Sequence, residues 1–283
     1  MRLSTRLAAG LALAAIAAVP SAASAVENGP APTAANLRAT TGSYAINTKA
    51  YTDAETGPGF GAGTVYWPKA NAGERFGVIA FAPGWTESAS AVDWLAKKAA
   101  SYGFVTISFN VNNTFLDLPD TRGKQLLAAL DFTTGTSVAK DAADVSRQAV
   151  AGHSMGGGAT LYASRLRPSL KAAVGLAPWA TSTSWTDIST PSLEIGAQND
   201  FIAPVNGHAK AFYESIPAST PKQYLEIKGL GHLGTNSASA KVGAPAVAWF
   251  KRYVDGDTRY QSAICPKQIG VLDSEISLFQ SNC

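Results

Sequence analysis

The chain has 283 residues, of which 46% are hydrophobic and 15% charged, and it carries a formal net charge of +3. This near balance gives no electrostatic reason to expect binding to nucleic acid or to a membrane surface. No repeat or linker divides the sequence, which is long enough for one large domain.

The first 25 residues have the three-part layout of a secretory signal peptide. Arg2 and Arg6 precede an almost wholly apolar run over residues 7–19, and residues 23–25 (Ala-Ser-Ala) follow as a cleavage signal. The run is too short for a membrane span. Cleavage after Ala25 leaves 258 residues with 21 Lys+Arg against 20 Asp+Glu, a net charge of +1. We therefore expect a secreted, extracellular protein, and a monomer.

Residues 26–41 are rich in Pro, Ala and Asn, so we expect a flexible, poorly structured lead-in before a single domain over residues 42–283. Within the domain, apolar runs that end at Pro or Gly alternate with segments of helical periodicity. The expected strands are 63–67, 76–82, 104–109, 147–151, 171–177, 192–196 and 223–227, and the expected helices are 90–102, 121–132, 156–167, 204–214 and 240–254. This alternation predicts an α/β fold with a mostly parallel central sheet, helices on both faces and ligands beyond the carboxyl ends of the strands.

Cys265 and Cys283 are the two cysteines of the chain, and both lie in the tail after the last predicted helix. In an exported protein they most simply pair and pin that tail, which stabilises by about 3 kcal/mol in the chain-entropy model. Two free thiols or a metal pair is the alternative. The two cysteines and three histidines have no metal-ligand spacing, so we expect no metal and no cofactor.

The pentapeptide Gly152-His153-Ser154-Met155-Gly156 stands between a predicted strand and a predicted helix. Gly-x-Ser-x-Gly is typical of a nucleophile elbow, where the serine has strained backbone geometry and only Gly leaves room on either side. The elbow lifts the Ser154 hydroxyl clear of the sheet and places the Met155 backbone N–H at a helix N-terminus, where it stabilises an oxyanion. Because the chain has 26 Gly, the alternative is an ordinary Gly-rich turn.

A serine nucleophile needs a base, and the chain has three histidines. His153 is the neighbour of Ser154, so its side chain leaves the backbone in a different direction and is expected to pack below the site. His208 lies within a predicted helix, and a histidine there is more often a surface residue that is solvated or hydrogen-bonded than a catalytic base. His232 follows the strand 223–227 in a Gly-rich loop, and we predict that it is the base. An ordinary loop histidine is the alternative.

Asp200 comes directly after the strand 192–196, whereas Asp187 precedes that strand and falls at the wrong edge. The chain order Ser154, Asp200, His232 is the order that the α/β-hydrolase fold requires. In this interpretation Asp200 holds the tautomer of His232 and stabilises its imidazolium.

A second oxyanion donor is expected from the loop after the strand 76–82, and the backbone N–H of Trp85 is the candidate. Removing such a donor costs about 2.7–4 kcal/mol of barrier. The alternative for Trp85 is a ring that belongs to the core.

Five separated segments together resemble the bacterial cutinase-like polyester hydrolases, a family that includes the poly(ethylene terephthalate) hydrolases. They are residues 82–86, 152–158, 177–179, 199–204 and 254–260. The likeness runs from about Pro32 to Cys283, and the segments agree in order and spacing. It implies an α/β-hydrolase and a secreted serine carboxylic-ester hydrolase that acts on aliphatic polyesters and short-chain esters, with poly(ethylene terephthalate) as a candidate substrate.

By this resemblance Ser154, Asp200 and His232 are the catalytic triad, and Trp85 and Met155 form the oxyanion hole. The substrate-binding residues that it implies are Trp85, Thr86, Met155, Trp179 and Ile202. Trp179 and Ile202 match an aromatic platform and an apolar wall of an open surface cleft. The resemblance also matches Cys265 and Cys283 to the C-terminal disulfide of the family.

The chain departs from the best-known mesophilic plastic-degrading member of that family. His153 stands where that enzyme has Trp and is the residue found in the cutinase-like members. Ala197 and Gly234 stand where the mesophilic subgroup has an extra cysteine pair. The segment 110–115 replaces a more regular Asp/Thr-rich segment, and Leu233 replaces a residue that is often Phe or Ser. These changes concern the subsites and stability more than the triad.

Two other functions are compatible with an α/β-hydrolase sequence. The first is a triacylglycerol lipase, but no long insertion predicts an apolar lid. The second is a non-catalytic binding module on the same fold. Such modules usually lack the nucleophile or the base, and here all three triad positions are filled.

Overall fold

The computed structural model describes residues 25–265 and 274–282, and their nine strands form one sheet. The strands are β1 (Ile46–Tyr51), β2 (Gly63–Pro68), β3 (Phe76–Ala82), β4 (Val105–Phe109), β5 (Ala143–His153), β6 (Ala172–Leu176), β7 (Ser192–Ala197), β8 (Lys222–Ile227) and β9 (Ile276–Ser281). Their order across the sheet is β1-β2-β4-β3-β5-β6-β7-β8-β9. Strands β3 to β8 pair in parallel, whereas β1, β2 and β9 are antiparallel to their neighbours. This confirms the predicted α/β-hydrolase fold.

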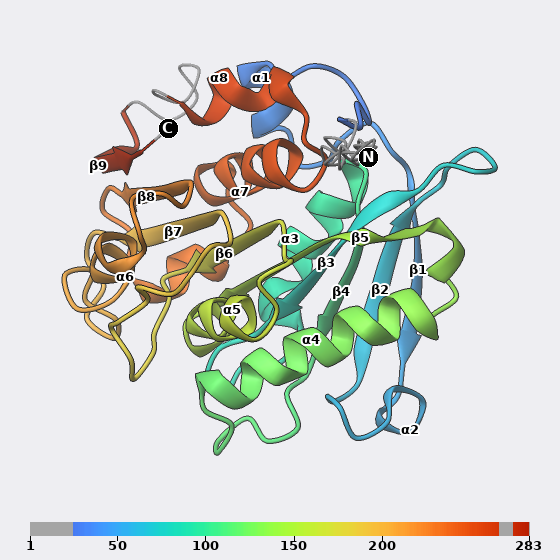
Figure 1. Ribbon diagram of the computed structural model, residues 1–283, viewed down its shortest axis with the longest axis horizontal. Coiled ribbons are helices and arrows are strands. Elements are labelled where there is room, and N and C mark those ends of the chain that lie inside the picture. The colour runs from blue at the N-terminus through green and yellow to red at the C-terminus, as the bar shows by residue number, and fades with distance from the viewer. Residues whose placement is uncertain (1–24, 266–273, 283) are drawn as a thin grey trace, which may run out of the picture.

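Helices cover both faces of the sheet (Figure 1). The helices of the described residues are α1 (Ala34–Arg38), α2 (Asp53–Thr56), α3 (Ser90–Ser101), α4 (Pro119–Gly135), α5 (Met155–Leu166), α6 (Ala209–Ser215), α7 (Ala240–Tyr253) and α8 (Gln261–Ile264), with 3₁₀ turns η1 (Lys140–Ala142), η2 (His232–Asn236) and η3 (Thr258–Tyr260). Alternate side chains of β3 pack against the helices on opposite faces of the sheet, because successive side chains of a strand point to opposite faces. Ile79 and Phe81 pack in a core with α3 and α7, whereas Val78 and Ala80 pack with α4 and α5.

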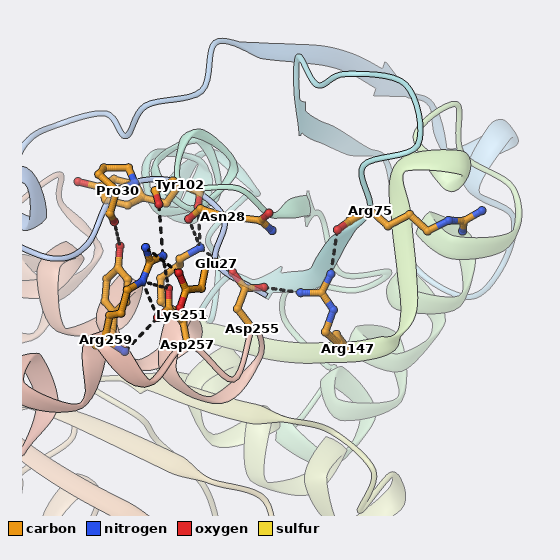
Figure 2. Close-up of polar contacts among 12 residues, drawn as sticks. Glu27, Asn28, Pro30, Arg75, Tyr102, Arg147, Lys251, Asp255, Asp257 and Arg259 are labelled. Carbon is orange, nitrogen blue, oxygen red and sulfur yellow. Dashed lines mark hydrogen bonds and ion pairs between the residues drawn. The ribbon is translucent and has the colours of Figure 1, made fainter. Parts of the chain in front are cut away.

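The segment 26–41 is ordered and docked on the domain, which corrects the expectation of a flexible lead-in. Helix α1 begins with a capping box at Thr33 and buries Leu37 in the core beside α7. Before it, the backbone carbonyls of Asn28 and Pro30 accept hydrogen bonds from Lys251 and Tyr260 (Figure 2). Composition failed here because Pro- and Ala-rich backbone still offers carbonyl acceptors to buried donors.

Other differences lie at the edges of the fold. Strands β1 and β9 were not predicted, and α6 begins only at Ala209, with the preceding residues of the predicted helix 204–214 in turns. Cys283 and residues 1–24 lie outside the described residues, so the pairing with Cys265 and the signal peptide stay predictions. No helix in the described ranges is long and apolar enough to cross a membrane.

Candidate active site

The turn from β5 into α5 has the geometry of a nucleophile elbow. Ser154 lies at φ 53° and ψ −118°, in a backbone region that non-Gly residues rarely adopt, and it caps α5. Its N–H donates to the Leu176 carbonyl at 2.9 Å, and its carbonyl accepts from Trp179 N–H at 2.8 Å. A Cβ on Gly156 would overlap the Ala82 carbonyl oxygen, so the sharp turn requires Gly at that position.

Three side chains from separate loops meet at the carboxyl edge of the sheet. His232 Nε2 lies 2.9 Å from Ser154 Oγ, and His232 Nδ1 lies 2.7 Å from Asp200 Oδ2. Ser154 follows β5, Asp200 follows β7, and His232 begins η2 after β8. The parallel strands bring these loops together because their carboxyl ends share one edge. The contacts let a proton pass from the serine hydroxyl to the imidazole.

Hydrogen bonds hold Asp200 as a carboxylate. Its Oδ1 accepts from the backbone N–H groups of Ile202 at 2.9 Å and Ala203 at 2.7 Å. Burial alone would raise the pKa of Asp200, but the hydrogen bonds from His232, Ala203 and Ile202 and the charge of His232 together lower it. An ionised Asp200 keeps the proton of His232 on Nδ1, which leaves Nε2 to accept from Ser154.

Two backbone N–H groups are free to bind an oxyanion. Met155 is the first residue of α5, and Trp85 lies in the loop after β3. Neither N–H has a hydrogen-bond acceptor within the ranges that the structure describes. At the first turn of a helix such an N–H also carries the favourable end of the helix dipole.

Arg122 of α4 fixes the loop that contains Trp85, and sequence reasoning missed it. The guanidinium is fully buried and donates from Nη1 to the carbonyls of Pro83 and Gly84, both at 2.9 Å. Its Nη2 donates to Thr114 O at 3.0 Å and its Nε to Asp117 O at 2.7 Å. Burial lowers the pKa of Arg122 to about 10, so the group stays charged at neutral pH. An arginine in a helix gives no sequence signal of such a role, because it is ordinarily exposed.

The predicted substrate-binding residues differ in their exposure. The Trp85 side chain is 53% exposed, which removes the alternative of a core ring, and it packs edge-on against Phe115 with ring centroids 6.3 Å apart. Thr86 lies at φ 60°, Ile202 is exposed, and Trp179 is half-buried with its ring 6.0 Å from that of His208.

An apolar rim lies on the loops at this edge of the sheet, and most of it was not foreseen. Exposed large apolar side chains occur in the loops after β3, β4, β7 and β8, whose carboxyl ends point to the same edge. The rim comprises Trp85, Phe115, Leu116, Leu118, Phe201, Ile202 and Leu233. Phe201, 92% exposed, directly follows Asp200. Seven exposed apolar residues around one site are a typical mark of an interaction surface.

The remaining histidines lie beside the site. His153 is buried below it, with Nδ1 2.9 Å from Glu87 Oε2 and Nε2 3.2 Å from the backbone oxygen of His232, which agrees with its expected place. His208 precedes α6 instead of lying within a helix, and it is partly buried between the rings of Trp179 and Phe212. Burial lowers the pKa of His208. Within the described ranges no group of three or more His, Cys, Asp or Glu is placed to hold a metal ion.

A serine on a strand–turn–helix elbow, with a histidine and an aspartate in hydrogen-bonded series behind it, places this chain among the α/β-hydrolases. Comparison with known families is more specific, because residues 20–283 match the model of the PET hydrolase-like family, and the chain belongs to it. It is thus an enzyme of the serine esterase class.

The chain is similar to several named proteins over most of its length. It is 45% identical over 241 residues to a bis(hydroxyethyl) terephthalate hydrolase of Streptomyces coelicolor, and the alignment covers 85% of this chain and 77% of that protein. It is 44% identical over 269 residues to cutinase est1 of Thermobifida alba, with 94% and 90% covered. Cutinase cut1 of Thermobifida fusca is 43% identical over 270 residues, with 95% and 83% covered.

Proposed function

We propose that this protein hydrolyses carboxylic esters through an acyl-enzyme on Ser154. We also propose that its substrates include polyesters, as expected of a cutinase-like enzyme. The observation that carries the proposal is the pair of contacts that His232 makes, to Ser154 at 2.9 Å and to Asp200 at 2.7 Å. Together they provide a nucleophile, a general base and an orienting acid.

The reaction follows from these contacts. Ser154 Oγ attacks the ester carbonyl carbon while His232 Nε2 accepts its proton, and the carbonyl oxygen becomes an oxyanion held by the N–H groups of Trp85 and Met155. The oxyanion collapses, the alcohol leaves with the proton from His232, and the acyl group stays on Ser154. Water then gives a proton to His232 as its oxygen attacks the acyl carbon, and His232 returns that proton to Ser154 Oγ as the acid leaves. Asp200 stabilises the imidazolium in both halves.

The apolar rim and the named relatives support polyesters as substrates. Trp85 and Ile202, exposed in the loops after β3 and β7, offer apolar contact to an extended polymer chain. Aliphatic polyesters and short-chain esters fit this surface, and poly(ethylene terephthalate) is a candidate. The relatives are named cutinases and a bis(hydroxyethyl) terephthalate hydrolase, and these names refer to a polyester or to a fragment of one as the substrate.

Replacement of the nucleophile tests the reaction. Ser154→Ala is expected to lower turnover of p-nitrophenyl butyrate by at least about 10⁴-fold and to abolish labelling by a fluorophosphonate probe. Ser182→Ala, at a partly exposed loop position, is the matched control and should behave as the wild type. Wild-type turnover by Ser154→Ala would exclude the mechanism, and an unlabelled wild type would favour the non-catalytic binding module.

Substrate scope separates polyesterase from lipase. We expect acid release from a polyester film and, among soluble esters from C4 to C16, a maximum at the short end. A maximum at C16 without release from film would instead favour a triacylglycerol lipase.

We also propose that the protein is secreted as a monomer, with Val26 as its first residue and a Cys265–Cys283 disulfide. The charged, apolar and small-residue order of the first 25 residues supports export, and the resemblance to the family supports the disulfide. Mass spectrometry of the secreted protein before and after reduction checks both points. A chain that retains residues 1–25, or gains no hydrogens on reduction, would contradict them.

A further inference from the structure

The carboxylate of Glu87 joins three segments of the chain beneath the site. Its Oε2 accepts from the backbone N–H of Gly84 at 2.6 Å and faces His153 Nδ1 at 2.9 Å. Its Oε1 accepts from Asn236 Nδ2 at 2.5 Å. These partners lie on the loop after β3, at the end of β5 and in η2, which are the segments that carry Trp85, Ser154 and His232.

His153 extends this network to the backbone of the general base. Its Nε2 lies 3.2 Å from the carbonyl oxygen of His232, and the two rings lie 4.8 Å apart. Both ring nitrogens of His153 therefore face oxygen atoms, one from the Glu87 carboxylate and one from the His232 backbone.

The environment of Glu87 keeps it ionised. Its side chain is 15% exposed. Burial alone would raise the pKa of Glu87, but the hydrogen bond from His153 and its charge, with the hydrogen bonds from Gly84 and Asn236, lower it. The carboxylate thus accepts from three donors at once, which no neutral side chain of the same shape does.

We infer that Glu87 is a positioning residue for catalysis, which holds the oxyanion loop through Gly84 and the loop of the general base through His153 and Asn236. Among the described residues no hydrogen bond joins its carboxylate to Ser154, and it acts by fixing where the Trp85 N–H and the His232 ring lie. The inference rests on the proposed function of Ser154 and His232.

Glu87→Gln tests this role, because glutamine keeps the shape but turns half of the acceptor into a donor. The amide NH2 group of the glutamine then faces another donor, either the Asn236 side chain or the Gly84 N–H beside His153, and one hydrogen bond is lost. We expect kcat for p-nitrophenyl butyrate, per site titrated with fluorophosphonate, to fall by about 10- to 100-fold, while KM changes by less than about twofold. Glu214→Gln makes the same change at an exposed position of α6 and should keep wild-type kcat.

A purely structural role would lower the number of titratable sites or the melting temperature and leave kcat per site unchanged, and that result would overturn the inference. If Glu87→Gln fails to fold, Asn236→Ala removes only the partner of Oε1 and should still lower kcat by about 3- to 10-fold. Unchanged kcat per site in that variant would also overturn it.

A double-mutant cycle tests whether Glu87 acts through His153. The variant with both Glu87→Gln and His153→Asn is expected to lose no more kcat than the more impaired single variant, whereas multiplied losses would overturn the route through His153. The Ser154→Ala variant, measured in parallel, separates failure of the proposed function from failure of the inference about Glu87. Turnover that survives in Ser154→Ala removes the proposed function, whereas wild-type kcat in Glu87→Gln removes only the present inference.

Discussion

Glu194 is an acid buried within the fold. It lies on β7, is fully buried, and neither carboxyl oxygen has a hydrogen-bond partner among the described residues. Burial raises the pKa of Glu194 well above its ordinary value, which favours the neutral acid. It fits against Gly175, where any Cβ would overlap its Oε2, and beside Pro178, the residue before Trp179. An apolar side chain of similar length would fill this space without a polar group to satisfy.

We therefore expect Glu194→Met to stabilise the protein, and to do so more at higher pH. Removing an unpaired buried acid contributes about 1–3 kcal/mol to the free energy of unfolding. Above about pH 4.3 the unfolded wild type releases the proton of Glu194 while the folded wild type retains it, so wild-type stability falls as pH rises toward the raised pKa. Methionine has no such proton. Urea unfolding at pH 5 and pH 8 measures the difference, and equal advantages at both values would contradict the explanation.

At the scale of elements, local sequence patterns predicted the central strands and the long helices. They did not predict the edge strands of the sheet or the contacts between residues far apart in the sequence. β3 is a continuous apolar run, but β1 has a single buried residue and no clear alternation. Ser154, Asp200 and His232 were predictable because each follows a strand whose carboxyl end meets the same edge. Arg122 and Glu87 were not, because their importance depends on partners such as Gly84 and Asn236 that lie 38 and 149 residues away, respectively.

Arg122 tests how much α4 contributes to the loop that contains Trp85. In Arg122→Lys one ammonium replaces a planar fork that reaches four carbonyls, so buried acceptors lose their donors. We expect a loss of about 2–3 kcal/mol in the free energy of unfolding and a kcat about 10-fold lower. Urea unfolding and turnover of p-nitrophenyl butyrate measure both.

The control for that prediction is Arg165→Lys, at a partly exposed ion pair with Asp187, which should change stability by less than about 1 kcal/mol. If Arg122→Lys changed stability no more than Arg165→Lys does, the buried fork would not hold the loop.

For the molecule as a whole, a buried ionic cluster joins the N-terminal segment to β5 and to the end of α7 (Figure 2). Asp255 is buried between Lys251, with Nζ 2.6 Å from Oδ2, and Arg147, with Nη1 2.5 Å from Oδ1. Burial raises the pKa of Asp255 against the lowering effect of both charges. The segment 26–30 completes the cluster with backbone groups, since Val26 N–H donates to the Asp255 carbonyl and Asn28 O accepts from Lys251 Nζ at 2.7 Å. Three described parts of the fold, β5, α7 and the N-terminal segment, therefore share one set of charges.

A chain that begins at Ala31 tests this arrangement. It lacks the carbonyl acceptors of Lys251, Arg259 and Tyr260, and hydrogen bonds to charged groups contribute about 1.5–3 kcal/mol each, so we expect the free energy of unfolding to fall by about 2–4 kcal/mol. The kcat per titrated site should stay within about twofold, because these contacts lie at the end of α7 and not at the triad. Glu27→Gln in the chain from Val26 removes only the exposed ion pair with Arg259 and should cost less than about 1 kcal/mol. Adding Lys251→Met should make the truncation cost less, since the buried ammonium that needs Asn28 is gone. Equal losses with and without Lys251→Met would show that the segment stabilises the fold by some other contact.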